Sequence, residues 1–298
     1  MAAVVVATST VLVTDGDSDD RAQASPAPIV TSPPPQISST PVGSSRTPPA
    51  VPAADPAVEL KRALDQRLGD LSDDVSAFAV DLASGKSVAY GQEEGMATAS
   101  MAKLDILLTL LMQKQDAGEM PSASERNTAS AMIRQSDNDA ATALWNAVGQ
   151  GTGIKAANEH LGLTATVPGQ SSYWGSTETN ARDQVRLMAS LYDVKGPLTQ
   201  AYRNFALDLL THVEVDQRWG VSAADDSGTA ALKNGWLPRE RDGNRWIVNS
   251  VGHVTTGGRE VVLAVLTRDS ATMPAGIDLI EDVAVRLRDT LAVQTRTS

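Results

Sequence analysis

The stretch that decides the fold is residues 100–112, which read Ser-Met-Ala-Lys-Leu-Asp-Ile-Leu-Leu-Thr-Leu-Leu-Met. From Leu104 onward the apolar residues surround a helix axis almost completely instead of forming one stripe. A helix that is apolar all round lies buried in the centre of a domain. We therefore predict a central buried helix, with Ser100 and Lys103 at its amino end.

This amino end carries groups suited to nucleophilic chemistry. Ser100 and Lys103 are one turn apart, so their side chains face the same side, and the helix dipole favours developing negative charge at Ser100. A partly desolvated lysine loses proton affinity and accepts a hydroxyl proton as general base. The alternative is an ordinary N-cap at Ser100 with Lys103 extended to solvent. A Ser-x-x-Lys pattern arises by chance on the order of once in a chain this long, so the context has to decide.

A second polar group stands at Ser136-Asp137-Asn138. A helix with the capping-box pattern Ser122 to Glu125 precedes it, and another helix follows. The group therefore suits a polar joint between two helices. It equally suits a site in which the Ser136 hydroxyl relays a proton and the Asn138 amide holds a substrate carbonyl.

A third group is Lys233-Asn234-Gly235, followed by Trp236, in an expected strand. A glycine inside a strand marks a bulge or a close approach by another backbone or a ligand, and Lys233 places a cation beside that approach. Arg259, at the start of the following expected strand, adds a second positive charge for a carboxylate. The alternative for each is a surface charge on a sheet.

Outward from these groups the pattern predicts an α+β fold. A helix starts after Asp55-Pro56, strands follow at 75–82 and 87–90, and helices fill 101–212. Strands return at 230–237, 245–255 and 260–267, and a helix at 275–291 closes the domain. This order predicts an antiparallel five-stranded sheet flanked by helices, with an inserted all-helical lobe and a ligand cleft between the lobes.

Charge and composition exclude several classes of protein. The net charge of −11 argues against a nucleic-acid partner, which needs a basic footprint. No apolar run approaches the roughly 20 residues that span a bilayer. The chain has no cysteine, which excludes disulfides, thiolate metal sites and a cysteine-linked lipid.

Two segments precede the domain, which we expect at 57–298. Residues 1–14 contain an apolar run of signal-peptide length without the usual basic residues in front, so we expect a secretory signal or anchor. Residues 15–56 hold ten of the fifteen prolines, together with Ser, Thr and Ala, which predicts a disordered linker. We expect an extracytoplasmic protein, secreted or tethered to the membrane at the cell envelope. The alternative is a disordered cytoplasmic extension.

The three groups, in this order, resemble the motif set of the penicillin-recognising serine hydrolases, and most closely the class A β-lactamases. The resemblance covers residues 57–298 and includes the hairpin at 81–86. It implies that Ser100 is the acylated nucleophile, that Lys103 is its base, and that Ser136 passes the proton to the leaving nitrogen.

The same resemblance assigns the substrate contacts. Asn138 binds the substrate amide, and Lys233, with Asn234, Gly235 and Arg259 nearby, holds a carboxylate. The backbone amides of Ser100 and Trp236 form the oxyanion hole.

Three departures from the family pattern matter. Ser136 follows Ser100 by only 36 positions, so a segment over the cleft is shortened. Asn234 replaces the usual Thr or Ser and removes a hydroxyl contact. No acid-x-x-Leu-Asn loop supplies the deacylating glutamate, and the one acid between Leu161 and Asn180 is Glu178. We interpret Glu178 as a first-turn acid of the next helix rather than a water activator.

The prediction is a monomeric serine hydrolase that forms an acyl-enzyme on β-lactam or peptidoglycan-related amide and ester carbonyls, with weak deacylation. A silent cell-envelope binding protein and a true β-lactamase with a substitute base are the alternatives, and loss of turnover in Glu178→Gln favours the latter. No cofactor or metal is expected. His160, His212 and His253 share no ligand spacing, so we expect structural roles for them.

Overall fold

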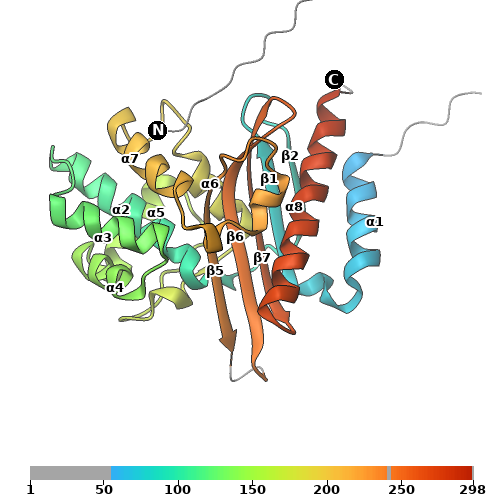
Figure 1. The fold of residues 1–298 in the computed structure, drawn as a ribbon, viewed down its shortest axis with the longest axis horizontal. Helices are drawn as coiled ribbons and strands as arrows, with labels where there is room; N and C mark the ends of the chain where they lie inside the picture. The colour runs from blue at the N-terminus through green and yellow to red at the C-terminus, as the bar shows by residue number, and fades with distance from the viewer. Residues whose placement is uncertain (1–54, 240–242, 297–298) are drawn as a thin grey trace, which may run out of the picture. The chain divides into compact units, whose positions relative to one another are not determined.

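The computed structural model describes residues 55–239 and 243–296, and its framework is one antiparallel sheet of five strands. The strands lie in the order β2-β1-β7-β6-β5, so both ends of the domain feed one sheet (Figure 1). They are β1 (Val75–Asp81), β2 (Ser87–Gly91), β5 (Ala231–Arg239), β6 (Arg245–Thr256) and β7 (Arg259–Ser270). The predicted α+β architecture with an inserted helical lobe is confirmed.

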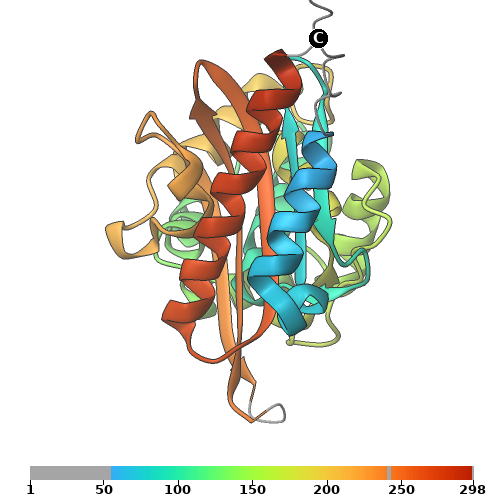
Figure 2. The same ribbon diagram turned by 90° about the vertical axis from the view of Figure 1, so that its right-hand side faces the viewer.

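Helices cover both faces of the sheet. Helices α1 (Pro56–Leu68) and α8 (Met273–Arg296) lie side by side on one face (Figure 2). The helices between β2 and β5 lie on the other face. They are α2 (Ala102–Asp116), α3 (Ala123–Arg134), α4 (Asn138–Ala147), α5 (Gln150–Leu161), α6 (Ala181–Ala189) and α7 (Gln200–Thr211). No helix within the described ranges combines the length and the apolar character that a membrane span requires.

Local sequence signals account for where several helices begin. Asp55 caps α1 by accepting from the Ala57 amide, and Pro56 occupies the first helical position, where its missing N–H costs nothing. Ser122 and Glu125 form the predicted capping box of α3. Asp137 caps α4 by accepting from the Ala140 amide, so the group at 136–138 does join two helices.

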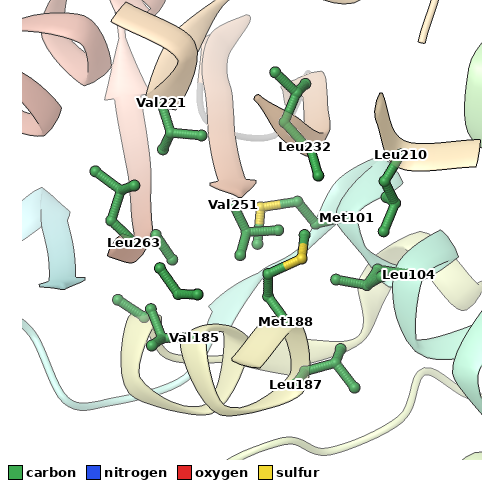
Figure 3. Packing of buried hydrophobic residues seen from close by; sticks show 14 of the residues in the cluster. Met101, Leu104, Val185, Leu187, Met188, Leu210, Val221, Leu232, Val251 and Leu263 are labelled. Carbon is green, nitrogen blue, oxygen red and sulfur yellow. The ribbon is translucent and has the colours of Figure 1, made fainter. Parts of the chain in front are cut away.

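Helix α2 is the centre of the domain, as its sequence predicts. Every residue from Ala102 to Met112 is buried. At its amino end Met101 and Leu104 pack against Met188 of α6 and Val251 of β6, so the helical lobe and the sheet share one core (Figure 3). The position of Lys103 is therefore set by packing from both layers.

A small second sheet was not predicted. Strand β3 (Met96–Ala97) pairs with β4 (Glu178–Thr179), directly before the turn that carries Ser100. Glu178 thus belongs to a strand, and the interpretation of it as a first-turn helix acid is wrong. Helix α6 begins after Asn180, whose side chain caps it, and its first-turn acid is Asp183.

The predicted segments ahead of the domain lie almost wholly outside the described residues. The signal or anchor at 1–14 and the linker at 15–56 remain predictions. Pro56, assigned to the linker, is the first residue of α1, because Asp55 caps the helix there.

Candidate active site

A buried lysine amine is the centre of the candidate site. The Lys103 side chain is 0% exposed. Its Nζ donates to the Ser136 carbonyl at 2.5 Å and to Asn138 Oδ1 at 2.8 Å, and it lies 3.1 Å from Ser136 Oγ. The alternative in which Lys103 extends to solvent is therefore wrong, because the amine points between α3 and α4.

Lys233 reaches the same hydroxyl from the sheet. Its Nζ lies 3.0 Å from Ser136 Oγ and donates to the Asn234 carbonyl at 2.9 Å. Ser136 Oγ thus stands between two buried amines that come from α2 and β5. A hydroxyl has one proton to donate and two lone pairs, so it can connect the two amines as a proton relay.

Burial shifts the proton affinity of both amines downward. Desolvation lowers the pKa of Lys103 to about 8, and the Asp137 carboxylate opposes that shift. Desolvation, and then the charge of Lys103, lower the pKa of Lys233 well below its usual value. A lysine with a pKa near 8 is partly neutral at physiological pH and suits a general base.

Ser100 lies in a short 3₁₀ turn, η2 (Ala99–Met101), directly before α2. It is half-buried, and no side chain caps this helix start, so the N-cap alternative for Ser100 is not realised. Ala99 has a φ of 47° and Ser136 a φ of 57°. Left-handed non-glycine residues are strained by about 1–3 kcal/mol and cluster at functional sites. Here Ala99 directly precedes the candidate nucleophile, and Ser136 is the candidate relay itself.

Gly235 brings the sheet against the Ser100 turn. A Cβ at Gly235 would lie 2.5 Å from the Thr98 carbonyl oxygen and 2.9 Å from the Ser100 amide nitrogen. The close approach predicted for this glycine is therefore made by the backbone of η2. Trp236 follows Gly235 on β5. The backbone amides of Ser100 and Trp236 therefore lie on two chain segments that are in contact.

Asn249 is a site residue that sequence reasoning missed. It lies opposite Gly235 on β6 and is 0% exposed. Its Nδ2 donates to the carbonyls of Ala97 at 2.9 Å and Thr98 at 3.2 Å, and its Oδ1 accepts from the Thr267 amide at 3.0 Å. The signal was a polar pair, Asn249-Ser250, inside an otherwise apolar strand.

The side chain of Asn234 does not join the cluster. Alternation along β5 sends it to the opposite face from Lys233. There Nδ2 donates to the carbonyls of Gln217 at 2.7 Å and Trp219 at 3.1 Å. Its Oδ1 accepts from Ser250 Oγ at 2.6 Å, so its polar atoms are engaged in holding the sheet to a neighbouring loop.

Two further predicted site residues also lie apart from the lysines. Arg259 begins β7, which is separated from β5 by β6, and its guanidinium reaches the Leu291 carbonyl of α8 at 3.5 Å. Arg259 does begin the predicted strand, but β6 separates that strand from β5, so Arg259 does not add the expected second positive charge beside Lys233. Glu178 lies against Gly95, in a hollow of about 270 Å³ that Arg239 and Arg268 also line.

One aromatic side chain, that of Trp174, lies against the lysine cluster. The Lys103 amine lies 4.9 Å from the Trp174 ring centroid, and Trp174 Nε1 donates to Thr142 Oγ1 of α4 at 3.2 Å. Trp236 packs edge-on against Trp219 with centroids 5.7 Å apart.

Among the described residues no cluster of His, Asp and Glu has metal-binding geometry. His253 stacks on Tyr192 and contacts Glu260 at 2.6 Å, which fits its predicted structural role.

The fold has the topology of the β-lactamase-like serine hydrolase family. Lys103 and Lys233 lie on either side of Ser136, and Ser100 stands one turn before Lys103. The model of the Beta-lactamase enzyme family matches residues 121–291, more than half of the chain. The chain belongs to this family. The match includes the motifs at Ser136 and Lys233 and begins after Ser100.

Curated relatives extend the match toward the amino end. The proteins described as "Putative lipoprotein LppW" of Mycobacterium tuberculosis and Mycobacterium bovis are 28% identical to this chain over 211 residues. The alignment covers 68% of this chain and 67% of the relative.

Solved structures show the same fold. The TLA-1 extended-spectrum β-lactamase matches with a TM-score of 0.70 and 15% identity, over 79% of this chain and 99% of that one. PBP-A matches with a TM-score of 0.67 and 19% identity, over 78% and 96%. A class A β-lactamase from Mycobacterium abscessus matches with a TM-score of 0.64 and 19% identity, over 80% and 99%.

Proposed function

We propose that this protein acylates itself at Ser100 on amide or ester carbonyls of β-lactam or peptidoglycan-related substrates, and that it deacylates slowly. The observation that carries the proposal is the Lys103 amine. It is 0% exposed, has a pKa of about 8, and points at Ser136 and Asn138 one turn after Ser100.

The acylation step assigns one role to each group. Ser100 Oγ attacks the carbonyl carbon, a C–O bond forms, and its proton passes to neutral Lys103. The amides of Ser100 and Trp236 stabilise the oxyanion. When the C–N or C–O bond to the leaving group breaks, Ser136 Oγ delivers a proton to that group and recovers one from the lysines.

The remaining groups orient the substrate. The Asn138 side chain is exposed and offers its amide to the substrate beside the Lys103 contact. Lys233 supplies a cation for a substrate anion, and an anion at this position would favour its protonated form. Asn234 and Arg259 are left out of this assignment, because their polar atoms are engaged elsewhere.

The two residues beside Lys103, Trp174 and Asp137, support slow deacylation. Trp174, rather than an acid, covers the amine at 4.9 Å. Asp137, whose charge acts on Lys103, accepts from the Ala140 amide as the cap of α4. Without a positioned general base, water attack loses a factor of about 100 to 10,000.

We also propose a location at the cell envelope. Relatives described as a lipoprotein and the apolar run before the linker support it. A small-molecule substrate rather than a nucleic acid is consistent with the family and with the net charge of −11.

Intact-mass spectrometry tests the proposal. The full chain is mixed with benzylpenicillin and followed in time beside Ser100→Ala. A persistent adduct that the variant lacks is the expected result. A transient adduct with the drug consumed would instead identify a working β-lactamase, and an equal adduct in Ser100→Ala would remove Ser100 from its role.

One observation favours a second candidate, a catalytically silent binding protein at the envelope. Asn234 replaces a hydroxyl residue, and its amide holds the loop at Gln217 and Trp219 instead of facing the cleft. No adduct with benzylpenicillin or with any activated ester would favour this candidate.

A further inference from the structure

The five-stranded sheet has two edge strands, β5 and β2. Lys233 of the candidate active site lies on β5, and β2 is the opposite edge of the sheet (Figure 1). A groove of about 530 Å³ opens beside β2, between this strand, α1 and the short helix η1 (Gly69–Asp74). We call it the β2 groove, and the residues that line it include Val58 and Asp65 of α1, Asp73 of η1, and Ala89 and Tyr90 of β2.

The backbone of β2 has hydrogen-bonding groups that no neighbouring strand uses. The Gln92 amide donates to the Val75 carbonyl of β1 at 2.7 Å. Bonded residues alternate along an antiparallel pair, so the even-numbered residues of β2 bond to β1. The N–H and C=O groups of Ser87, Ala89 and Gly91 therefore point away from the sheet, and no described residue bonds to them.

The side chains at the outward positions leave this edge open. Ser87, Ala89 and Gly91 are all small and exposed. The strand reads Ser-Val-Ala-Tyr-Gly and contains neither proline nor lysine, which are residues that commonly block an edge. An unblocked edge strand is a template for pairing with another extended chain. The β2 edge can therefore accept one more strand.

Acidic residues dominate the chain around the β2 groove. Residues 55–94 contain nine acidic and four basic residues. Inside the groove, Asp65 accepts from Lys61 at 2.6 Å and from the Tyr90 hydroxyl at 3.0 Å. The Asp73 carboxylate has no partner among the described residues. Burial, then Asp65 and then the charge of Asp73 raise the pKa of Tyr90, so both carboxylates act on the groove.

An exposed valine lies beside these acids. Val58 is 62% exposed on α1 and lines the same groove. A lysine or arginine side chain has an apolar stem and a charged end. Such a side chain can cover Val58 with its stem and bring its charge to Asp73. The groove thus suits a basic ligand better than an acidic or a short polar one.

Charge also decides between two occupants of the edge. A second copy of this chain would carry the same acidic excess and a net charge of −11 to the edge. Like charges oppose such self-association. A basic segment gains from the same charges that repel the second copy.

We propose that the β2 groove binds an extended, basic polypeptide segment of a partner protein, which adds to the sheet as a further strand beside β2. Main-chain hydrogen bonds to Ser87, Ala89 and Gly91 hold the segment, and a basic side chain reaches Asp73. The inference does not rest on acylation of Ser100, because the site lies at the other edge of the sheet. Its failure leaves the proposed function standing.

Titration with a synthetic peptide tests the inference on the full chain. The probe is acetyl-Thr-Lys-Val-Lys-Val-Lys-Thr-amide, and NMR spectra of the isotope-labelled protein report the affinity and the location of binding. We expect saturable shifts of the amides of Ser87, Ala89 and Gly91, and slower hydrogen exchange at these amides. Absence of saturable shifts at these amides overturns the inference.

Two matched peptides separate the backbone from the charge. Methylation of the five central amide nitrogens removes the donors of an added strand and should weaken binding about tenfold or more. Glutamate in place of the three lysines should weaken binding about tenfold, and added salt should weaken binding of the basic probe. Equal affinity of the methylated peptide overturns strand addition, and equal affinity of the acidic peptide overturns the basic partner.

Variants locate the effect at β2. Ala89→Pro removes one outward N–H and keeps the bonds to β1, because an edge strand tolerates proline where its N–H faces solvent. It should weaken binding about fivefold or more. Ala89→Thr keeps the N–H and is the matched control, with affinity unchanged. Thermal melting checks the fold, and the methylated peptide decides on the parent chain where Ala89→Pro does not fold.

A second pair of variants tests the charge. Asp73→Asn should weaken binding about threefold, which is typical of an exposed ion pair. Asp116→Asn, at an exposed residue of α2, is its control and leaves the affinity unchanged. Unchanged affinity in both Asp73→Asn and a folded Ala89→Pro overturns the site.

Sedimentation of the parent and Ala89→Pro examines the competing occupant. A concentration-dependent dimer that Ala89→Pro abolishes would assign the edge to a second copy and overturn the basic partner. A parent chain that stays monomeric excludes the second copy, as expected.

Discussion

Lys103 and Asp105 lie two residues apart on α2, carry opposite charges, and are both at most 2% exposed. Burial moves both pKa values toward neutrality, that of Lys103 down to about 8 and that of Asp105 up to about 7. They point to different surroundings. Lys103 faces three acceptor atoms of Ser136 and Asn138, whereas Asp105 faces Asn158 of α5 inside the helical lobe.

The pair at Asp105 is explained by a protonated carboxyl. Asn158 Nδ2 donates to Asp105 Oδ2 at 3.0 Å, whereas Asp105 Oδ1 and Asn158 Oδ1 have no partner among the described residues. A proton on Asp105 avoids the cost of a buried charge and makes the carboxyl itself a hydrogen-bond donor. Asp183 raises the pKa of Asp105 further, after the larger effect of burial and against the effect of Asn158.

The comparison shows that burial alone does not make a reactive group. Desolvation makes Lys103 a base because the Ser136 hydroxyl lies beside its amine. The same desolvation favours the neutral form of Asp105, which contacts only the Asn158 amide and has a structural role. The surroundings, not the size of the shift, separate the two roles.

The largest effect is expected when the Lys103 amine is removed. Lys103→Met should lower the rate of Ser100 acylation by about 100- to 10,000-fold, because the hydroxyl loses its general base. Adduct formation by mass spectrometry measures the rate, and thermal melting confirms that the variant folds. An acylation rate within threefold of the parent would show that Lys103 is as structural as Asp105.

Removing the acid should act on stability instead. With a folded pKa near 7 against an ordinary 3.8, Asp105 binds more protons in the folded state, so stability falls as pH rises from about 4 to 7. Asp105→Asn removes this loss and should be more stable than the parent above pH 7, by up to about 4 kcal/mol.

Denaturant unfolding at pH 5 and pH 8 measures the effect of Asp105→Asn. Asp116→Asn, at an exposed residue of the same helix, is the matched control and should leave the pH dependence unchanged. Equal pH dependence in parent and Asp105→Asn would show that Asp105 is ionised in the folded protein.

Acylation at Ser100 should also depend on the hydrogen bonds that Asn249 of β6 makes to the chain before Ser100. Asn249→Ala removes two hydrogen bonds to the chain just before Ser100 and should lower the rate of Ser100 acylation about tenfold or more, because small displacements of a nucleophile are costly. Adduct formation by mass spectrometry measures the rate, and Leu287→Ala, a core variant remote from the turn, controls for lost stability. An equal loss of acylation rate in both variants would contradict a positioning role.

The smallest effect is the pH dependence of the reaction. Neutral Lys103 is the base, so the acylation rate should rise about tenfold from pH 7 to pH 9 around the pKa near 8. Over the same range Lys103 itself contributes rising stability, since its folded pKa lies below the ordinary 10.5. Rates of adduct formation with benzylpenicillin, followed by intact-mass spectrometry between pH 7 and pH 9, give the profile. A flat profile would remove Lys103 as the titrating base.

Much of the fold was predictable because its signals are local. The all-round apolar pattern of residues 104–112 predicted a central helix, and the predicted helix starts after Asp55 and at the capping box Ser122 to Glu125 are confirmed. The hairpin and the late strands followed from short apolar runs between turns. The family followed from the order of three short motifs.

The sequence by itself determined the strands of the main sheet, the central helix and the helix start that carries Ser100 and Lys103, because helix and strand periodicities act over a few neighbouring residues. Only the tertiary structure decided that Asn234 faces away from the lysines, that β6 separates Arg259 from β5, and that Asn249 holds the chain before Ser100. These outcomes depend on strand order and on packing between segments as far apart as residues 97 and 249. Spacing along the chain does not encode them, since they arise when distant apolar faces close on one core.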